Sequence, residues 1–299
     1  MTVKLGINPI GWTNDCMHWL GDFITLERCL AEVKQAGFSG VELGRKFPRQ
    51  AAQLGPLLEA HDLQLVSGWY SAELLTRDAK AEIAAMREHL ALLAGLGSPV
   101  MVFAETTKEI INNVGAPASA RPKIESAAEW KRLGQRFTAV ADHLQAKGVR
   151  MAVHHHMGTV IQTAEDVDRL MENTGPAVGL LLDTGHMTFA GGDPLAVAKR
   201  HGDRIVHVHC KDIRRYALAA CQGRDVSFSQ AVLEGLFTAP GDGMVDYPGL
   251  LKILAGARYS GWLVQEAEQD PRIAHPLTYA SLGCAHLKKL CATAKLKLA

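Results

Sequence analysis

Short apolar runs recur along the chain, and each is followed by a polar or glycine-containing loop and then by a stretch with amphipathic helical spacing. The runs are rich in Val, Ile and Leu, as expected for strands that are covered on both faces. We predict eight strands, at residues 3–8, 38–43, 63–68, 99–104, 149–154, 178–183, 205–210 and 261–266. Helical spacing is clearest over residues 26–36, 79–96 and 129–147.

Strand and helix alternate at intervals of about 25–55 residues, which is typical of parallel βαβ units. Eight such units predict an α/β protein with a closed (β/α)₈ TIM barrel. Two connections are long, at 105–128 and 211–248, and both follow strands, so we expect them on the face that carries the active site. With no internal repeat or linker to divide it, the chain is expected to form a single domain over residues 1–299.

Composition narrows the classes of function. The chain has 299 residues, 47% of them hydrophobic, and a formal charge of +1, which argues against a nucleic-acid partner. No apolar stretch approaches the roughly 20 residues that cross a bilayer, and the first residues lack the layout of a signal peptide. The six cysteines are scattered, as in reduced proteins. We therefore expect a cytoplasmic protein without a membrane partner; a homo-oligomer is compatible with the sequence.

Ionisable side chains lie at the ends of four successive predicted strands, where barrel enzymes place their sites. They are His154, His155 and His156, then Asp183, then His207 and His209, then Glu266 and Glu268. Because side chains two apart share a face of a strand, each strand can direct one or two of these groups to a common point. Two imidazoles and two carboxylates suit a transition metal better than Ca²⁺ or Mg²⁺.

Each of these residues also has an ordinary structural explanation. A histidine on a strand is often only hydrogen-bonded in the core, Asp183 before Thr-Gly-His can cap a helix, and Glu268 can be a surface charge. Their coincidence on successive strands favours a shared metal site. Only two of the three consecutive histidines can face the same way, so we expect His155 to be the bystander.

Longer segments resemble a known family. GINPIGWTN (6–14), HHHMGTV (154–160), RIVHVHCKD (204–212) and GWLVQEAEQDP (261–271) are similar to segments of the xylose-isomerase-like TIM barrels, and within them of the myo-inosose-2 dehydratases. The resemblance runs nearly end to end. It implies metal ligation by His154, Asp183, His209 and Glu266, with Mn²⁺ or Co²⁺ as the metal and glutathione as an additional cofactor of some relatives. The family usually has glutamate at the place of His154, which leaves the first ligand open between His154 and His156.

The resemblance further implies a hydro-lyase of inositol catabolism that removes water from 2-keto-myo-inositol to give a trihydroxycyclohexane-1,2-dione. The reaction needs a general base and a general acid. Candidates are Lys211, His186 and Glu268, with their roles left open. A bound metal is expected to lower the pKa of Lys211, although Lys211 can equally pair with Asp212 or Asp183.

Substrate contacts are expected from the imidazole of His156 and from aromatic rings that follow the first and third strands. Ring faces suit the C–H side of a cyclitol, although the same rings can simply be packing residues. The candidates are His156, Trp12, Trp69 and Tyr70.

Three other functions are compatible with this pattern: a metal-dependent sugar isomerase or epimerase on the same barrel, a nuclease, and a sugar-binding barrel without catalysis. The near-neutral charge argues against the nuclease. The full set of candidate ligands argues against the non-catalytic protein.

Overall fold

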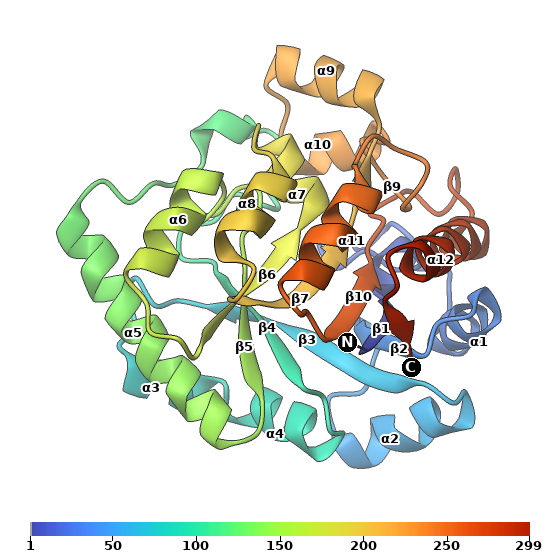
Figure 1. The fold of residues 1–299 in the computed structure, drawn as a ribbon, viewed down its shortest axis with the longest axis horizontal. Helices are drawn as coiled ribbons and strands as arrows, with labels where there is room; N and C mark the ends of the chain where they lie inside the picture. The colour runs from blue at the N-terminus through green and yellow to red at the C-terminus, as the bar shows by residue number, and fades with distance from the viewer. Residues whose placement is uncertain (1) are drawn as a thin grey trace.

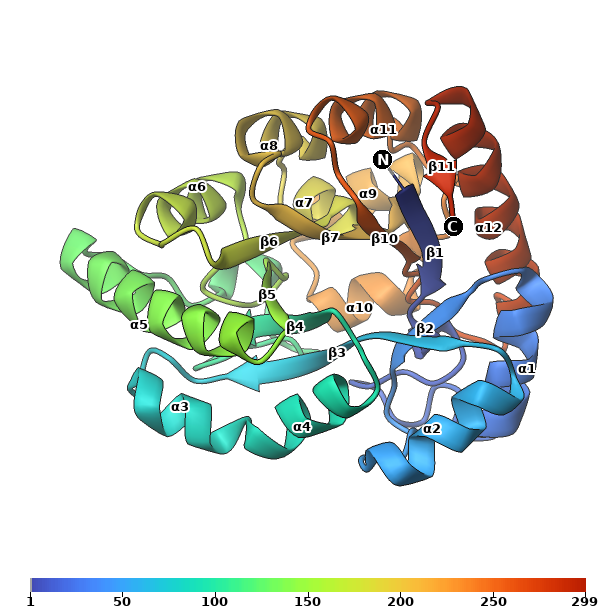
Figure 2. The same cartoon turned by 60° about the horizontal axis from the view of Figure 1, so that its bottom comes forward.

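The computed structural model describes residues 2–299, and within this range eight parallel strands close into a barrel with helices around it (Figures 1 and 2). In order around the barrel they are β1 (Thr2–Ile7), β2 (Gly40–Leu43), β3 (Gln64–Ala72), β4 (Val100–Glu105), β5 (Arg150–His154), β6 (Val178–Asp183), β7 (Ile205–Cys210) and β10 (Gly261–Gln265). The barrel closes where β10 pairs with β1, with Leu263 opposite Leu5. The predicted (β/α)₈ barrel is therefore confirmed.

Helices cover the outside of the barrel (Figure 2). They are α1 (Leu26–Ala36), α2 (Ala51–Ala60), α3 (Ala79–Ala85), α4 (Arg87–Gly95), α5 (Ala127–Ala146), α6 (Ala164–Glu172), α7 (Thr184–Phe189), α8 (Pro194–His201), α11 (Tyr247–Gly256) and α12 (Pro276–Thr293). The predicted helix over 79–96 is divided into α3 and α4 at Met86, where φ is −85° and ψ is 0° while the side chain stays buried. α1 matches its predicted span: the Thr25 side chain caps its start, and Gly37, at φ 96°, ends it in a left-handed conformation.

The interior of the barrel changes from apolar to polar along the strands. At one end Val66, Trp262 and Val264 pack together, and they come so close to Gly6 and Gly40 that a Cβ on Gly40 would lie 2.6 Å from Val66. Further along, Val100, Val102, Ala152, Leu181 and Val206 form a second apolar group. Two residues beyond Gly40, Ala152, Leu181 and Val264 lie Glu42, His154, Asp183 and Glu266. Strand alternation therefore directs these four polar groups into the same end of the barrel.

The connection between β7 and α11 is more ordered than the long loop expected over 211–248. It contains β8 (Asp212–Ile213), α9 (Arg215–Arg224), α10 (Phe228–Leu233) and β9 (Phe237–Thr238), and β8 pairs antiparallel with β9. Figure 1 shows α9 beyond the ring of helices. Phe228 and Phe237 pack with Ile111 from the connection over 105–128, which contains η2 (Ala118–Ala120). These segments form a second apolar cluster at the polar end of the barrel.

Shorter elements complete the chain. η1 (Pro9–Gly11) follows β1, and β11 (Lys297–Leu298) pairs with the start of β1. None of the helices within residues 2–299 has the length and apolarity needed to cross a membrane.

Candidate metal centre and active-site cavity

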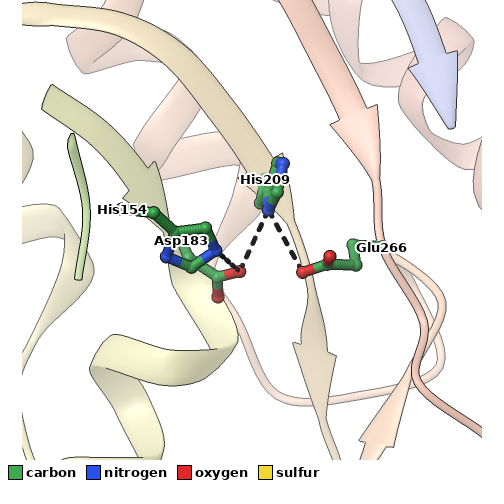
Figure 3. A group of neighbouring side chains, drawn as sticks. All are labelled: His154, Asp183, His209 and Glu266. Atoms are coloured by element: carbon green, nitrogen blue, oxygen red, sulfur yellow. Dashed lines mark hydrogen bonds and ion pairs between the residues drawn. The ribbon is translucent and has the colours of Figure 1, made fainter. Parts of the chain in front are cut away.

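Four ionisable side chains converge at the polar end of the barrel (Figure 3). They are His154, Asp183, His209 and Glu266; all four are buried, and one nitrogen or oxygen of each lies within 4.8 Å of those of the others. The Asp183 Oδ2 atom is 3.7 Å from His154 Nε2 and 3.5 Å from His209 Nδ1, and His209 Nδ1 is 3.1 Å from Glu266 Oε2. The structure thus brings together the four residues that the sequence predicts as metal ligands.

Hydrogen bonds at the far side of both imidazoles determine which nitrogen faces this cluster. The Nδ1–H group of His154 donates to the backbone carbonyl of His155 at 2.7 Å, and the Nε2–H group of His209 donates to Glu42 Oε1 at 3.2 Å. Because a backbone carbonyl can only accept, His154 Nε2 keeps a lone pair directed at Asp183. His209 contacts a carboxylate through each ring nitrogen, with Nδ1 3.1 Å from Glu266 Oε2. Burial lowers the pKa of His209, but Glu266 and Glu42 outweigh that effect and hold it well above its usual value, so an ion would take the place of the proton on Nδ1. Nitrogen and oxygen atoms separated by 3–4 Å can bind one divalent ion at distances of about 2.0–2.1 Å.

The two oxygens of Asp183 serve different purposes. Oδ1 accepts a hydrogen bond from the backbone N–H of His186 at 2.7 Å and caps α7, whereas Oδ2 is buried without a hydrogen-bond partner among residues 2–299. The helix cap and the metal ligand that the sequence left as alternatives are therefore compatible in one side chain. A buried carboxylate oxygen without a partner is unfavourable, and a cation in contact with it would remove that cost. The residues present fit a divalent metal.

The two other histidines of the triplet have separate surroundings. His155 was the expected bystander, but its Nε2 atom accepts a hydrogen bond from the backbone N–H of Asp183 at 3.1 Å and so fixes the backbone of a candidate ligand. His156 donates from Nδ1 to the carbonyl of Met157 at 2.7 Å, and its ring lies 3.8 Å from that of His186. His154 therefore belongs to the four-residue cluster and His156 lies beside it.

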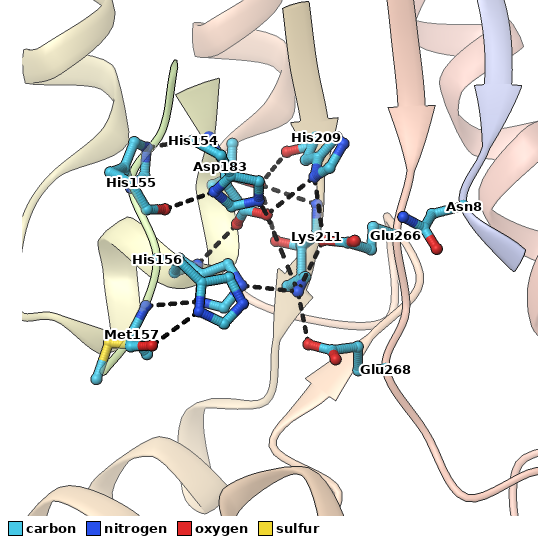
Figure 4. Close-up of polar contacts among 12 residues, drawn as sticks. Asn8, His154, His155, His156, Met157, Asp183, His209, Lys211, Glu266 and Glu268 are labelled. Carbon is cyan, nitrogen blue, oxygen red and sulfur yellow. Dashed lines mark hydrogen bonds and ion pairs between the residues drawn. The ribbon is translucent and has the colours of Figure 1, made fainter. Parts of the chain in front are cut away.

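Lys211 connects the cluster to a second carboxylate (Figure 4). Its Nζ atom lies 2.8 Å from both Glu266 Oε2 and Glu268 Oε2, and 3.0 Å from His186 Nε2. Of the two partners left open by the sequence, Asp183 lies within ion-pair distance, with Oδ2 3.9 Å from Nζ. Asp212 instead accepts from backbone N–H groups, including that of Gly241 at 2.9 Å.

Without a metal ion, the charges around Lys211 raise its pKa. Burial lowers the pKa of Lys211, but Glu266, Glu268 and Asp183 outweigh that effect and hold it well above its usual value. The lowering predicted for the metal-bound protein stays a prediction. Burial also raises the pKa of Glu268, to about 7, although Lys211 opposes the shift.

A cavity of about 510 Å³ opens directly on the cluster. His154, His156, His209, Glu266 and Glu268 form its floor. Trp69 stands at its side, in edge contact with His154 and His156 at ring separations of 5.4 and 5.5 Å. Ser71, Thr106 and Asn112 add hydroxyl and amide groups from loops and strand ends. This mixture of one aromatic wall with many polar groups suits a small polyhydroxylated molecule.

Two aromatic residues expected at the substrate lie elsewhere. Trp12 is 1% exposed, packs in the core between barrel and helices, and donates its indole N–H to Glu32 of α1 at 2.6 Å. Tyr70 follows Trp69 on β3 and so points to the opposite face, where its ring packs on Phe103. The expectation that these two rings face the cavity is corrected by these contacts.

Glu42 was missed by the sequence reasoning. It lies at the end of β2 and lines the cavity, and its carboxylate contacts both His207 and His209. The available signal was its position: a glutamate near the end of an apolar strand, as Glu266 directly follows the last barrel strand.

Comparisons with known proteins agree with the barrel fold. The family model of the xylose isomerase-like TIM barrel matches residues 30–290. The rhizopine catabolism protein MocC of Rhizobium meliloti is 50% identical over 298 residues, covering 100% of this chain and 91% of that protein. The inosose dehydratase of Geobacillus thermodenitrificans is 42% identical, covering 97% of each chain. A solved L-ribulose 3-epimerase is similar in fold, with a TM-score of 0.66 at 17% identity and coverage of 99% and 96%.

Proposed function

Since this chain belongs to the xylose isomerase-like TIM barrel family, we propose that it is an inosose dehydratase, a hydro-lyase that removes water from 2-keto-myo-inositol in inositol catabolism. The observation that carries the proposal is the 42% identity to an inosose dehydratase across 97% of both chains. The polar cavity with its one aromatic wall supports it. We infer that the activity resides in one barrel domain over residues 1–299, because the last barrel strand pairs with the first.

We propose that His154, Asp183, His209 and Glu266 hold a divalent transition metal, Mn²⁺ or Co²⁺. Two imidazoles and two carboxylates favour such an ion over Ca²⁺ or Mg²⁺, and the two carboxylates balance its charge. Bound there, the ion would supply Lewis-acid stabilisation of negative charge on the ketone oxygen.

The proton transfers are assigned to the side chains that reach the cavity. Glu268 lines the cavity and is proposed to take the proton from the carbon beside the carbonyl. The protonated Glu268 then gives this proton to the hydroxyl group that leaves the next carbon, and the two depart as water. Lys211 is 1% exposed and donates a hydrogen bond to Glu268, and its Nζ atom also contacts His186 Nε2. Lys211 and His186 are therefore proposed to position Glu268 rather than to touch the substrate.

Two further side chains are proposed to bind the substrate. His156 donates from Nδ1 to the backbone, so its Nε2 lone pair is left to accept a hydrogen bond from a substrate hydroxyl. Trp69 is placed to cover the C–H face of the ring.

The test is product analysis with purified protein, 2-keto-myo-inositol and Mn²⁺ or Co²⁺, with and without glutathione. Dione formation is expected, and Glu268→Gln should lower turnover by about 10²–10⁴-fold and abolish solvent-deuterium exchange at the carbon beside the ketone. Glu165→Gln on the exposed face of α6 is the control and should behave as wild type. Unchanged turnover in Glu268→Gln would remove Glu268 from the proton transfer.

Other substrates belong in the same assay. The 50% identity to a protein named for rhizopine catabolism favours rhizopine as a second candidate substrate. A product isomeric with the substrate would replace the dehydratase proposal by a sugar isomerase or epimerase. Binding of the substrate without any product would indicate a non-catalytic barrel.

A further inference from the structure

The Glu42 carboxylate accepts hydrogen bonds from two other strands of the barrel and from the residue that follows a third. Oε1 accepts from Ser67 Oγ of β3 at 2.5 Å and from His207 Nε2 and His209 Nε2 of β7 at 2.8 and 3.2 Å. Oε2 accepts from Asn8 Nδ2, just after β1, at 2.8 Å. Glu42 is 2% exposed, so these four donors replace water around it.

We propose that Glu42 is a positioning residue that holds the ring of His209 in the tautomer and orientation in which Nδ1 faces Asp183 and Glu266. This inference rests on the proposed function, because its purpose is to prepare the proposed metal site. Glu42 is not one of the four candidate ligands. It contacts His209 at Nε2, on the edge of the ring opposite to Nδ1, which faces Glu266.

The physical argument concerns a competition between two tautomers. With its proton on Nε2, His209 donates to Glu42 and its Nδ1 lone pair is available to an ion. With its proton on Nδ1, His209 would instead donate to Glu266 Oε2, 3.1 Å away, and this proton would occupy the place of the ion. Because each ring nitrogen contacts a carboxylate, a bound ion must displace the proton from Nδ1 while the proton on Nε2 stays. An acceptor at Nε2 stabilises the ring in this metal-binding tautomer, and a carboxylate is the strongest acceptor a side chain offers.

The neighbouring donors explain why Glu42 can perform this role without binding an ion itself. The carboxylate of Glu42 accepts hydrogen bonds from N–H and O–H groups of Asn8, Ser67 and His207, and these bonds occupy its lone pairs. They also fix its orientation, because they come from β3, from β7 and from the residue that follows β1. Glu42, His207 and His209 lie close enough to suggest a second ion, but both imidazoles already contact Glu42 through Nε2 at hydrogen-bond distance.

The experiment measures Zn²⁺ binding, which can be followed without substrate. Zn²⁺ is also diamagnetic, so the same loaded protein is suitable for NMR. Calorimetry should give one Zn²⁺ per chain. Glu42→Leu removes every acceptor and should weaken Zn²⁺ binding by about 10–100-fold, and Glu42→Gln, which returns a neutral acceptor, should recover part of this loss. Ser67→Ala removes one donor to the same carboxylate but leaves the contact with His209, so it should bind Zn²⁺ much as wild type does.

Nitrogen-15 NMR of the Zn²⁺-loaded wild-type protein tests the tautomer directly, whether or not Glu42→Leu folds. A proton on His209 Nε2 with the metal on Nδ1 is expected, with the signal assigned by its loss in His209→Asn. Metal on Nε2, a second Zn²⁺ per chain, absence of Zn²⁺ binding, or wild-type affinity in a folded Glu42→Leu would each overturn the inference. If the expected NMR signal appears but no dehydration is detected, the inference stands and the proposed function is overturned. If dehydration is detected without the expected NMR signal, the proposed function stands and the inference is overturned.

Discussion

Asp183→Asn separates the two tasks of a single side chain. The amide oxygen can still accept the hydrogen bond from His186 N–H and cap α7, so the cost of about 1 kcal/mol for a lost cap is avoided. The other oxygen, which has no hydrogen-bond partner among the described residues, becomes an NH₂ group that cannot bind a cation. The metal-free variant should therefore be at least as stable as the metal-free wild-type protein.

The expected magnitude follows from mass action. An ion at a hundred times its dissociation constant stabilises the folded state by about 2.7 kcal/mol. For a chain of 299 residues this corresponds to a rise in Tm of about 4 °C. Calorimetric unfolding with and without Mn²⁺ or Co²⁺ should show this rise in the wild-type protein and lose it in Asp183→Asn.

Asp193→Asn is the matched control, because Asp193 caps α8 through the same type of hydrogen bond, to Leu195 N–H at 2.8 Å, away from the cluster. It should keep the full rise in Tm. Asp183→Ala should lose the rise and also be less stable than Asp183→Asn by about 1 kcal/mol without metal. An undiminished rise in Asp183→Asn would refute the assignment of Asp183 as a ligand.

Two further predictions concern other buried sites. Burial raises the pKa of Glu105 from 4.5 to about 7, so the folded state holds a proton that the unfolded chain releases, and the unfolding free energy should fall by about 3 kcal/mol as the pH rises from below 4.5 to above 7. Denaturant unfolding should show this fall in the wild-type protein relative to Glu105→Gln; parallel pH profiles would contradict it. A Cβ at Gly185 would lie 2.5 Å from Lys211 Cγ, so Gly185→Ala should lower turnover at least tenfold while keeping the metal-dependent rise in Tm. Gly256→Ala, where a Cβ meets open space, is the control, and equal turnover in both variants would show that the position of Lys211 does not matter.

The sequence predicts the barrel and the cluster well because both follow from a local rule. Side chains alternate along a strand, and parallel strands end at the same edge, so His154, Asp183, His209 and Glu266 can be brought to one point without knowledge of any distant contact. The prediction fails where a strand is longer than its apolar run. β3 continues to Ala72, so Trp69 and Tyr70 lie on a strand and face opposite ways, whereas an end at residue 68 places both in a loop.

Contacts distant in the chain set the remaining properties of the site. Glu42 is 165 and 167 residues from the histidines it contacts, and no spacing in the sequence relates them. The pKa of Lys211 also depends on contacts that are distant in the chain. The place of Lys211 beside His209 follows from alternation along the strand, but the charges that surround it do not. Three carboxylates, from β6 and from the segment after β10, gather around one ammonium, and together they outweigh the effect of burial. A divalent ion would neutralise two of the three, Asp183 and Glu266, and leave Glu268 as the main partner of Lys211. Metal binding and the pairing of Lys211 with Glu268 are therefore linked through the carboxylates they share.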